Sequence, residues 1–205
     1  MYMKILTVFN IINRSYYETT KRTKLDSEWL LVNHENQYNV LAIRGTEKKA
    51  FLDVLCNLLS LIPYKSKFGW VSLGYYKAAE RIANQMIDVL QQQHYVNHPP
   101  IIVCGHSLGA ITSFFVANIL SNMGFPISAW VGVGTLNGTL SNIKFNFKAY
   151  NFRFRSDISN LYPFKFLGFK QPHPLINIKV DKPNHNILDD HHLINYINHA
   201  PDMDI

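Results

Sequence analysis

Cysteine is scarce in this chain of 205 residues, and its scarcity excludes a fold built on disulfide bridges. The two cysteines, Cys56 and Cys104, are too few for the framework of bridges that small secreted domains use. Cys104 lies in an apolar run typical of a strand, so we expect it to be a buried free thiol. This cysteine usage favours a reducing compartment such as the cytoplasm.

Long apolar stretches, repeats and low-complexity tracts are also missing. No stretch reaches the length of about 18 apolar residues that a membrane-spanning helix needs. The apolar run at 5–12 is interrupted by Asn10 and is not followed by a small-residue cleavage site. We therefore expect it to be the first structural segment of the domain rather than a signal peptide. The length and the absence of linkers predict a single domain over 1–205.

Runs of basic residues and clustered metal ligands are absent from the sequence as well. The net charge is +6, but lysines and arginines are spread along the chain in small groups, so we expect no nucleic-acid partner. A mildly basic surface favours peripheral contact with an anionic lipid interface instead. The spacing of His185, His191 and His192 is poor for a metal site, and there is no phosphate-binding glycine loop. We expect neither a metal nor an organic cofactor.

Apolar runs alternate with helical patterns through the middle of the chain. The expected strands are 29–33, 38–44, 101–104, 127–133 and 150–154, and the expected helices are 51–62, 75–93 and 108–120. The run 101–104 is continuously apolar, as a parallel strand buried on both faces would be. This alternation predicts an α/β fold with a mostly parallel central sheet flanked by helices.

The pattern Gly105-His106-Ser107-Leu108-Gly109 lies between an expected strand and an expected helix. A nucleophilic serine needs a tight strand-to-helix turn, and glycines two residues before and after it let the two elements approach closely. The amide of Leu108, at the helix N-terminus, would point towards a developing oxyanion. This context predicts that Ser107 is the nucleophile of a serine hydrolase of the α/β-hydrolase type.

A catalytic triad also needs an acid and a base, which follow the serine in the order Asp, His in this fold. Asp157 follows an expected strand and fits the acid, with an Asx turn or helix cap as the alternative role. The candidate bases are the histidines downstream of it: His173, His185, His191, His192 and His199. His173 follows Asp157 too closely to lie comfortably on a later loop. The residues alone leave the choice between His191 and His192 open.

Several motifs in one order resemble those of the class 3 lipases, the fungal-lipase-like branch of the α/β hydrolases. The elbow at 105–110 is similar to that of the family, and 43–46 resembles its R-G-T/S motif. Segment 53–58 resembles D-W-x-x-N-L with Val54 in place of the tryptophan. Segment 156–163 resembles the stretch that carries the family's acid, and 190–196 resembles its D-H-S-L-x-x-Y ending. The resemblance covers about 29–197.

The resemblance implies a role for each matching residue. Ser107 would be the nucleophile, His191 the general base and then acid, and Asp157 the group that orients the imidazole. The amides of Thr46 and Leu108 would form the oxyanion hole. Arg44 would have a structural role near the site.

Segment 47–62 corresponds to the family's lid, with an apolar face of Phe51, Leu55, Leu58 and Leu59. The alternative for this segment is an ordinary core helix. Departures from the family concern the surroundings of the triad: Ser72 stands where the family has a histidine, and the turn at 134–138 lacks the family's proline. They leave substrate size and interfacial activation open.

We expect a hydrolase of acyl esters that works through an acyl-enzyme on Ser107. The basic balance and the lid segment favour lipids, either as a triacylglycerol lipase or as a phospholipase A1-like enzyme. A catalytically inactive lipid-binding protein and an acyltransferase on the same fold are the alternatives.

Overall fold

The computed structural model describes residues 3–18, 21–22, 28–45, 59–92, 99–162, 165–179 and 189–205. Its main sheet has seven strands in the order β1-β2-β3-β6-β7-β8-β9. Their bounds are β1 (Lys21–Arg22), β2 (Glu28–His34), β3 (Tyr38–Ile43), β6 (Ile101–His106), β7 (Ile127–Val133), β8 (Lys148–Phe154) and β9 (Ile176–Ile178). Strands β1 to β3 pair antiparallel at one edge, and β3, β6, β7, β8 and β9 pair parallel. The predicted mostly parallel sheet is confirmed.

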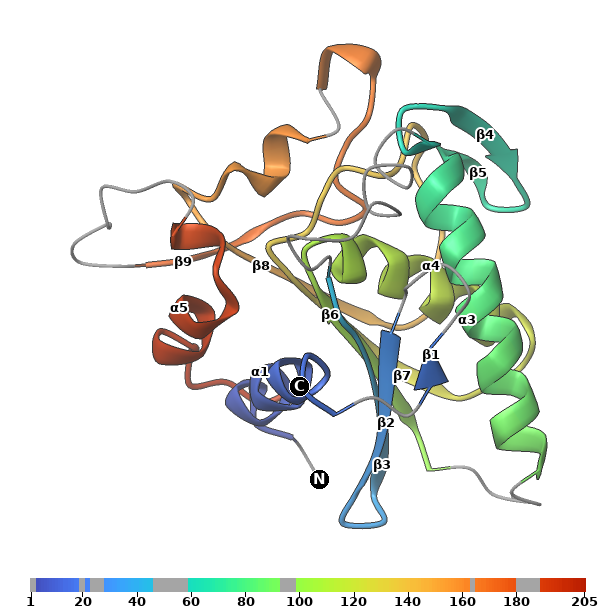
Figure 1. Cartoon of the computed structure of the whole chain (residues 1–205), viewed down its shortest axis with the longest axis vertical. Helices are drawn as coiled ribbons and strands as arrows, with labels where there is room; N and C mark the ends of the chain where they lie inside the picture. The colour runs from blue at the N-terminus through green and yellow to red at the C-terminus, as the bar shows by residue number, and fades with distance from the viewer. Residues whose placement is uncertain are drawn as a thin grey trace.

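Helices cover both faces of this sheet (Figure 1). Helices α3 (Leu73–Gln92) and α4 (Leu108–Asn122) lie on one face, and α1 (Ile5–Arg14) and α5 (Leu193–Asn198) lie on the other. Successive strand residues point to opposite faces, so a central strand supplies both cores. In β6, Val103 packs in the core of the α3–α4 face and Cys104 in the core of the α1–α5 face.

Helix α4 is the central helix of the fold and is buried on all sides. Every residue from Gly109 to Leu120 is buried, because the helix packs against both the sheet and α3. Gly124, with φ of +91°, follows its end. None of the helices in the described ranges combines the length and the apolar composition that crossing a bilayer requires.

The apolar run near the N-terminus forms α1, which buries one face against the sheet. Just before α1, Met3 exchanges backbone hydrogen bonds of 3.4 and 3.0 Å with Ile205. The side chain of Lys4 forms an exposed ion pair with that of Asp202. The two ends of the described chain therefore lie side by side, with α1 packed against α5.

A hairpin of β4 (Pro63–Ser66) and β5 (Gly69–Ser72) is a strand pair that the sequence pattern does not predict. Strand β5 runs directly into α3, which therefore begins two residues before its predicted start. Pro63 opens β4, as a proline can at the first residue of a strand. The expected helix 51–62 lies almost wholly outside the described residues, and 60–62 form a turn.

The thiol of Cys104 is fully buried and free, as expected. Burial raises its pKa, so the thiol stays protonated and unreactive. Cys56 lies outside the described residues.

Candidate active site

Ser107 occupies a strained turn between β6 and α4. Its backbone has φ of 58° and ψ of −125°, a combination that costs on the order of 1–3 kcal/mol and persists only when the surroundings enforce it. Two hydrogen bonds hold the turn in place. The Ser107 amide donates to the carbonyl of Val133 at 2.9 Å, and the Ala110 amide donates to the carbonyl of Ser107 at 3.0 Å.

The two elbow glycines are required by close backbone contacts. A Cβ on Gly105 would lie 2.4 Å from the carbonyl oxygen of Gly109. A Cβ on Gly109 would lie 2.2 Å from the carbonyl oxygen of Ile43, at the end of β3. Because no side chain fits at either contact, β6, α4 and the end of β3 can pack this closely only with glycine.

The structure brings Ser107, His191 and Asp157 together in one hydrogen-bonded chain. Nε2 of His191 lies 2.8 Å from Oγ of Ser107, and Nδ1 lies 3.0 Å from each carboxylate oxygen of Asp157. Asp157 comes from the loop after β8, and His191 comes from the short helix η3 (Asp189–His191). The acid is fully buried and the imidazole is partly exposed, so the histidine can reach both the serine and a substrate.

The surroundings of Asp157 keep its carboxylate ionised. Burial by itself would raise the pKa of Asp157, but the hydrogen bond and charge of His191, with the Tyr196 hydroxyl and the Ser159 amide, lower it. An ionised carboxylate only accepts hydrogen bonds, so Nδ1 of His191 carries the proton and donates it. Nε2 then presents its lone pair to the Ser107 hydroxyl, which donates.

Asp157 also caps the N-terminus of a short helix, which is the alternative role predicted for it from the sequence. Its Oδ1 accepts the Ser159 amide at 2.7 Å at the start of η1 (Ile158–Leu161). The two roles coexist, because each carboxylate oxygen has two lone pairs. The cap fixes the carboxylate in the orientation that His191 contacts.

The backbone around η3 directs the ring of His191, not that of His192, towards Ser107. The hydroxyl of Ser156 donates to the carboxylate of Asp190, which ties η3 to the end of β8. His192 is exposed at the start of α5.

The other candidate bases lie elsewhere or outside the described residues. His173 follows η2 (Lys165–Leu167) and contacts the carbonyl of Pro174 through Nδ1. His199 is exposed at the end of α5. His185 lies outside the described residues.

Tyr196 is a further residue that contacts the site; the sequence motif contains it, but the residue types alone do not reveal it. Its buried hydroxyl donates to Oδ2 of Asp157 and accepts the Phe154 amide at 3.2 Å. It therefore joins α5 and the end of β8 to the acid. The spacing of five residues after His191 was the available signal.

Gly134 at the end of β7 is a second such residue. Its φ is +55°, and a Cβ there would lie 2.9 Å from Oδ2 of Asp157 and 3.1 Å from the imidazole of His191. Only glycine leaves room for Asp157 and His191 at this point. A glycine directly after an apolar strand was the signal in the sequence.

On the oxyanion side, the structure describes the chain up to Gly45. A Cβ on Gly45 would lie 3.1 Å from Cβ of Ser107, so the end of β3 packs directly on the elbow. The amide of Leu108 is in the first turn of α4, where amides lack partners within the helix. Thr46 and the expected lid as far as residue 58 lie outside the described residues.

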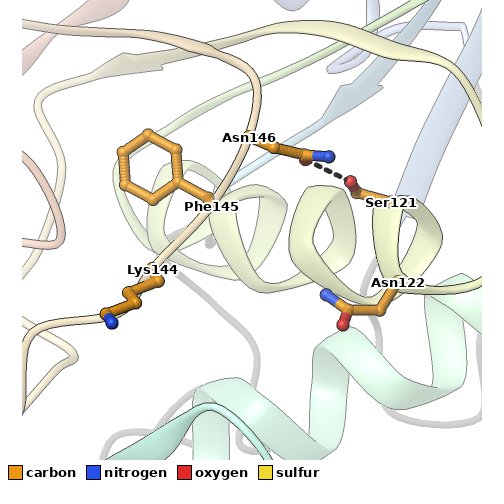
Figure 2. Close-up of a pocket in the computed structure, with 5 residues that line it drawn as sticks. All are labelled: Ser121, Asn122, Lys144, Phe145 and Asn146. Atoms are coloured by element: carbon orange, nitrogen blue, oxygen red, sulfur yellow. Dashed lines mark hydrogen bonds between the residues drawn. The ribbon is translucent and has the colours of Figure 1, made fainter.

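A surface pocket of about 310 Å³ lies away from this site, at the far end of α4 (Figure 2). Its lining is largely polar and consists of Ser121, Asn122, Lys144, Phe145 and Asn146. Ser121 and Asn146 are joined by a hydrogen bond of 2.7 Å. At 1.5 Å per helical residue, Ser121 is about 20 Å along the axis from Ser107, so this pocket cannot hold the bond that Ser107 would attack.

Comparison with known structures shows similarity to fungal lipases. A lipase from Rhizopus microsporus var. chinensis is 18% identical, with a TM-score of 0.65 over 86% of this chain and 74% of that one. The triacylglyceride lipase of Rhizomucor miehei is 15% identical, with a TM-score of 0.60 over 80% and 75% of the two chains. At these identities the similarity shows the fold alone.

The sequence comparisons give a family. No curated protein matches the chain significantly. The family model described as Lipase (class 3) matches residues 40–150, which is more than half of the chain. The chain therefore belongs to the class 3 lipase family, whose members are carboxylic ester hydrolases with a serine triad.

Proposed function

We propose that this protein hydrolyses the acyl esters of lipids through an acyl-enzyme on Ser107. The observation that carries the proposal is the hydrogen-bonded chain from Ser107 through His191 to Asp157. A strained serine at the N-terminus of a buried helix, beside an oriented imidazole, fits acyl transfer.

In the first half of the reaction, Oγ of Ser107 attacks the ester carbonyl carbon while Nε2 of His191 takes the hydroxyl proton. The charge of Asp157 stabilises the imidazolium that forms. The carbonyl oxygen becomes an oxyanion beside the amide of Leu108, and Thr46 is the proposed second donor. When the tetrahedral intermediate collapses, Nε2 gives its proton to the departing alcohol, and the acyl group stays on Ser107.

In the second half, a water molecule replaces the alcohol. His191 takes a proton from the water as it attacks the acyl carbon, and a second tetrahedral intermediate forms. Collapse breaks the bond to Oγ, and the proton returns to Ser107. The carboxylic acid leaves and the enzyme is restored.

Exposed apolar side chains support a lipid as the substrate. Helices η1 and η2, which follow Asp157 in the chain, carry Leu161, Phe166 and Leu167, with exposed fractions of 56%, 81% and 41%. Trp70 on the β4–β5 hairpin is 48% exposed. Such side chains, together with a net charge of +6, favour peripheral contact with a lipid interface.

Labelling with a fluorophosphonate probe tests the nucleophile. We expect the folded protein to be labelled and its Ser107→Ala variant to remain unlabelled. If the folded wild type takes up no probe, the proposal of an active hydrolase is wrong.

A panel of p-nitrophenyl esters of rising chain length, beside triacylglycerol and phospholipid emulsions, tests the substrate. We expect kcat/KM to rise with chain length and an emulsion to be hydrolysed. A preference for acetyl esters with no activity on either emulsion would contradict the lipid substrate and leave the ester hydrolase standing.

A further inference from the structure

A second hydrogen-bonded chain runs beneath the triad, through the histidine of the elbow. Nε2 of His106 lies 2.8 Å from the carbonyl oxygen of His191, and Nδ1 lies 2.6 Å from the hydroxyl of Tyr16. The same hydroxyl lies 3.1 Å from the amide of Gly45. Tyr16 follows the end of α1, so this chain joins α1 to three segments of the active site.

The direction of each hydrogen bond follows from its ends. The carbonyl of His191 can only accept, so Nε2 of His106 must carry a hydrogen and donate it. In a neutral imidazole Nδ1 is then an acceptor, and the Tyr16 hydroxyl must donate to it. The oxygen of Tyr16 in turn accepts the amide of Gly45, which can only donate. Every member of the chain has one consistent role.

Burial keeps His106 in this neutral form. Its side chain is 7% exposed, and burial, with repulsion from His191, lowers its pKa to about 3. The other neutral tautomer would turn the lone pair of Nε2 against the carbonyl of His191. The Tyr16 hydroxyl disfavours that tautomer because its proton occupies Nδ1.

The hydrogen-bonded chain ends at two main-chain segments, and both must be held in place around Ser107. One end holds the main chain of His191, the base, whose ring centroid is 4.9 Å from that of His106. The other end holds Gly45, which packs on the elbow and directly precedes Thr46.

We propose that Tyr16 and His106 are positioning residues for the reaction. Tyr16 sets the tautomer of His106, and the pair holds the main chain of His191 and the end of β3 in register with Ser107. Neither residue touches the reacting atoms, so both act through groups that do. The inference rests on the proposed role of Ser107 and His191.

Tyr16→Phe is the sharpest test, because it keeps the ring and removes only the hydroxyl. A displacement of catalytic groups by a fraction of an ångström to 1 Å lowers turnover by about 10- to 100-fold. We expect a fall of that size in kcat with KM unchanged within about 2-fold, since the groups displaced act on the transition state. Tyr17→Phe is the matched control: Tyr17 is the next residue and is 82% exposed, so we expect wild-type kinetics.

Two substitutions of His106 separate the halves of the chain. In His106→Gln, the longer side chain places an amide N–H where Nε2 was and can keep the bond to the carbonyl of His191. In His106→Asn, the shorter side chain places an amide oxygen near Nδ1 and can keep the bond to Tyr16. We expect each variant to retain more activity than His106→Ala. Adding Tyr16→Phe to His106→Gln should cost less than Tyr16→Phe costs in the wild type, because the bond between Tyr16 and residue 106 is already broken and only the bond to the Gly45 amide is left to lose.

A spectroscopic measurement excludes a merely structural role. In ¹⁵N NMR spectra of the imidazoles, we expect the Nε2–H tautomer of His106 in the wild type and in Tyr17→Phe. In Tyr16→Phe we expect a shift towards a mixture of tautomers. A Tyr16→Phe variant with wild-type kcat and an unchanged tautomer would overturn the inference.

Fluorophosphonate labelling keeps this failure distinct from failure of the proposed function. If the wild type is not labelled at Ser107, the proposed function fails. If Tyr16→Phe is labelled as fast as the wild type, only the positioning role fails. We expect labelling of the variant that is complete but slower by the same factor as its kcat.

Discussion

The two faces of the central sheet differ in the kinds of contact that they make. On the α3–α4 face, large apolar side chains pack against one another: the ring of Phe114 lies 5.1 Å from that of Trp130 and 5.5 Å from that of Phe145, centroid to centroid. The indole of Trp130 donates to the hydroxyl of Ser113 at 2.8 Å, a contact internal to the core. Packing of this kind stabilises the fold.

On the α1–α5 face, the same sheet carries polar groups among its aliphatic ones. Tyr16 follows α1 and Tyr196 lies in α5, and their hydroxyls bond to His106 and Asp157. The helices of this face therefore supply hydrogen-bond partners to the active site as well as apolar surface. Substitutions on the α3–α4 face should lower stability, whereas polar deletions on the α1–α5 face should lower turnover.

The largest expected effect comes from removing the base at the edge of the α1–α5 face. His191→Ala should lower kcat on the order of 10⁵-fold or more, as loss of a triad histidine does in other serine hydrolases. His192→Ala is the matched control and should keep most of the activity, because His192 is exposed beside the site. Steady-state kinetics on one p-nitrophenyl ester compare the two. The reverse outcome would show that His192 is the base.

Removing a large side chain from the α3–α4 core should have the opposite effect, with a loss of stability and little change in kcat. Phe114→Ala removes a fully buried ring and should lower the free energy of unfolding by about 3–5 kcal/mol. The kcat per active site, counted by fluorophosphonate titration, should stay within about 3-fold of wild type, because Phe114 lies two helical turns from Ser107. Urea unfolding gives the stability. A loss of kcat above 10-fold in the folded fraction would break the division between the faces.

Much of this architecture is predictable because its signals are local. The elements α4, β6 and β7 are largely apolar segments bounded by glycine, proline or polar turns, and the structure has them within a few residues of the predicted bounds. The short strands β4, β5 and β9 carry too few residues for a periodic pattern. Contacts distant in the chain also hold them in place, as in the isolated bridge between Val71 of β5 and Thr139.

The same division holds for the active site. The pattern around Ser107 is contained in five consecutive residues, so the nucleophile and its turn can be predicted directly. His191 and His192 are neighbours, and only the turn of η3, tied to β8 through Ser156 and Asp190, decides which ring faces the serine. Tyr16 meets His106 across 90 positions of the chain. A pattern of neighbouring residues cannot predict a contact between positions so far apart in the sequence.

Tyr196→Phe tests the polar role of the α1–α5 face with a smaller expected effect. The variant keeps the buried ring but removes the hydroxyl that bonds to Oδ2 of Asp157 and to the Phe154 amide. We expect kcat to fall by about 10-fold, the equivalent of one hydrogen bond of about 1.4 kcal/mol to a charged group. The conservative control on the other face is Tyr64→Phe, at a half-buried tyrosine of the β4–β5 hairpin, which should leave kcat unchanged. A wild-type kcat in Tyr196→Phe would show that the other partners of Asp157 hold it without the tyrosine.

The last expected effect is on stability rather than on turnover, and it is a dependence on pH that belongs to the α1–α5 face. Above pH 6.5, the ordinary pKa of histidine, His106 is neutral in both the folded and the unfolded chain. Between pH 6.5 and its folded pKa of about 3, only the unfolded chain binds the proton, so the folded state loses at most about 1.4 kcal/mol per pH unit as the pH falls. The pKa of Asp157 is lowered in the folded state. The contribution of Asp157 to the free energy of unfolding is therefore complete above about pH 4, the ordinary range of an aspartate pKa, and is lost only as the pH falls further.

Urea unfolding from pH 6.5 to 4.5 should therefore show a flatter dependence of the unfolding free energy on pH in His106→Gln than in wild type. His199→Gln, at an exposed histidine, should keep the wild-type slope. Equal slopes in His106→Gln and wild type would place the acid sensitivity elsewhere and remove this distinction between the faces.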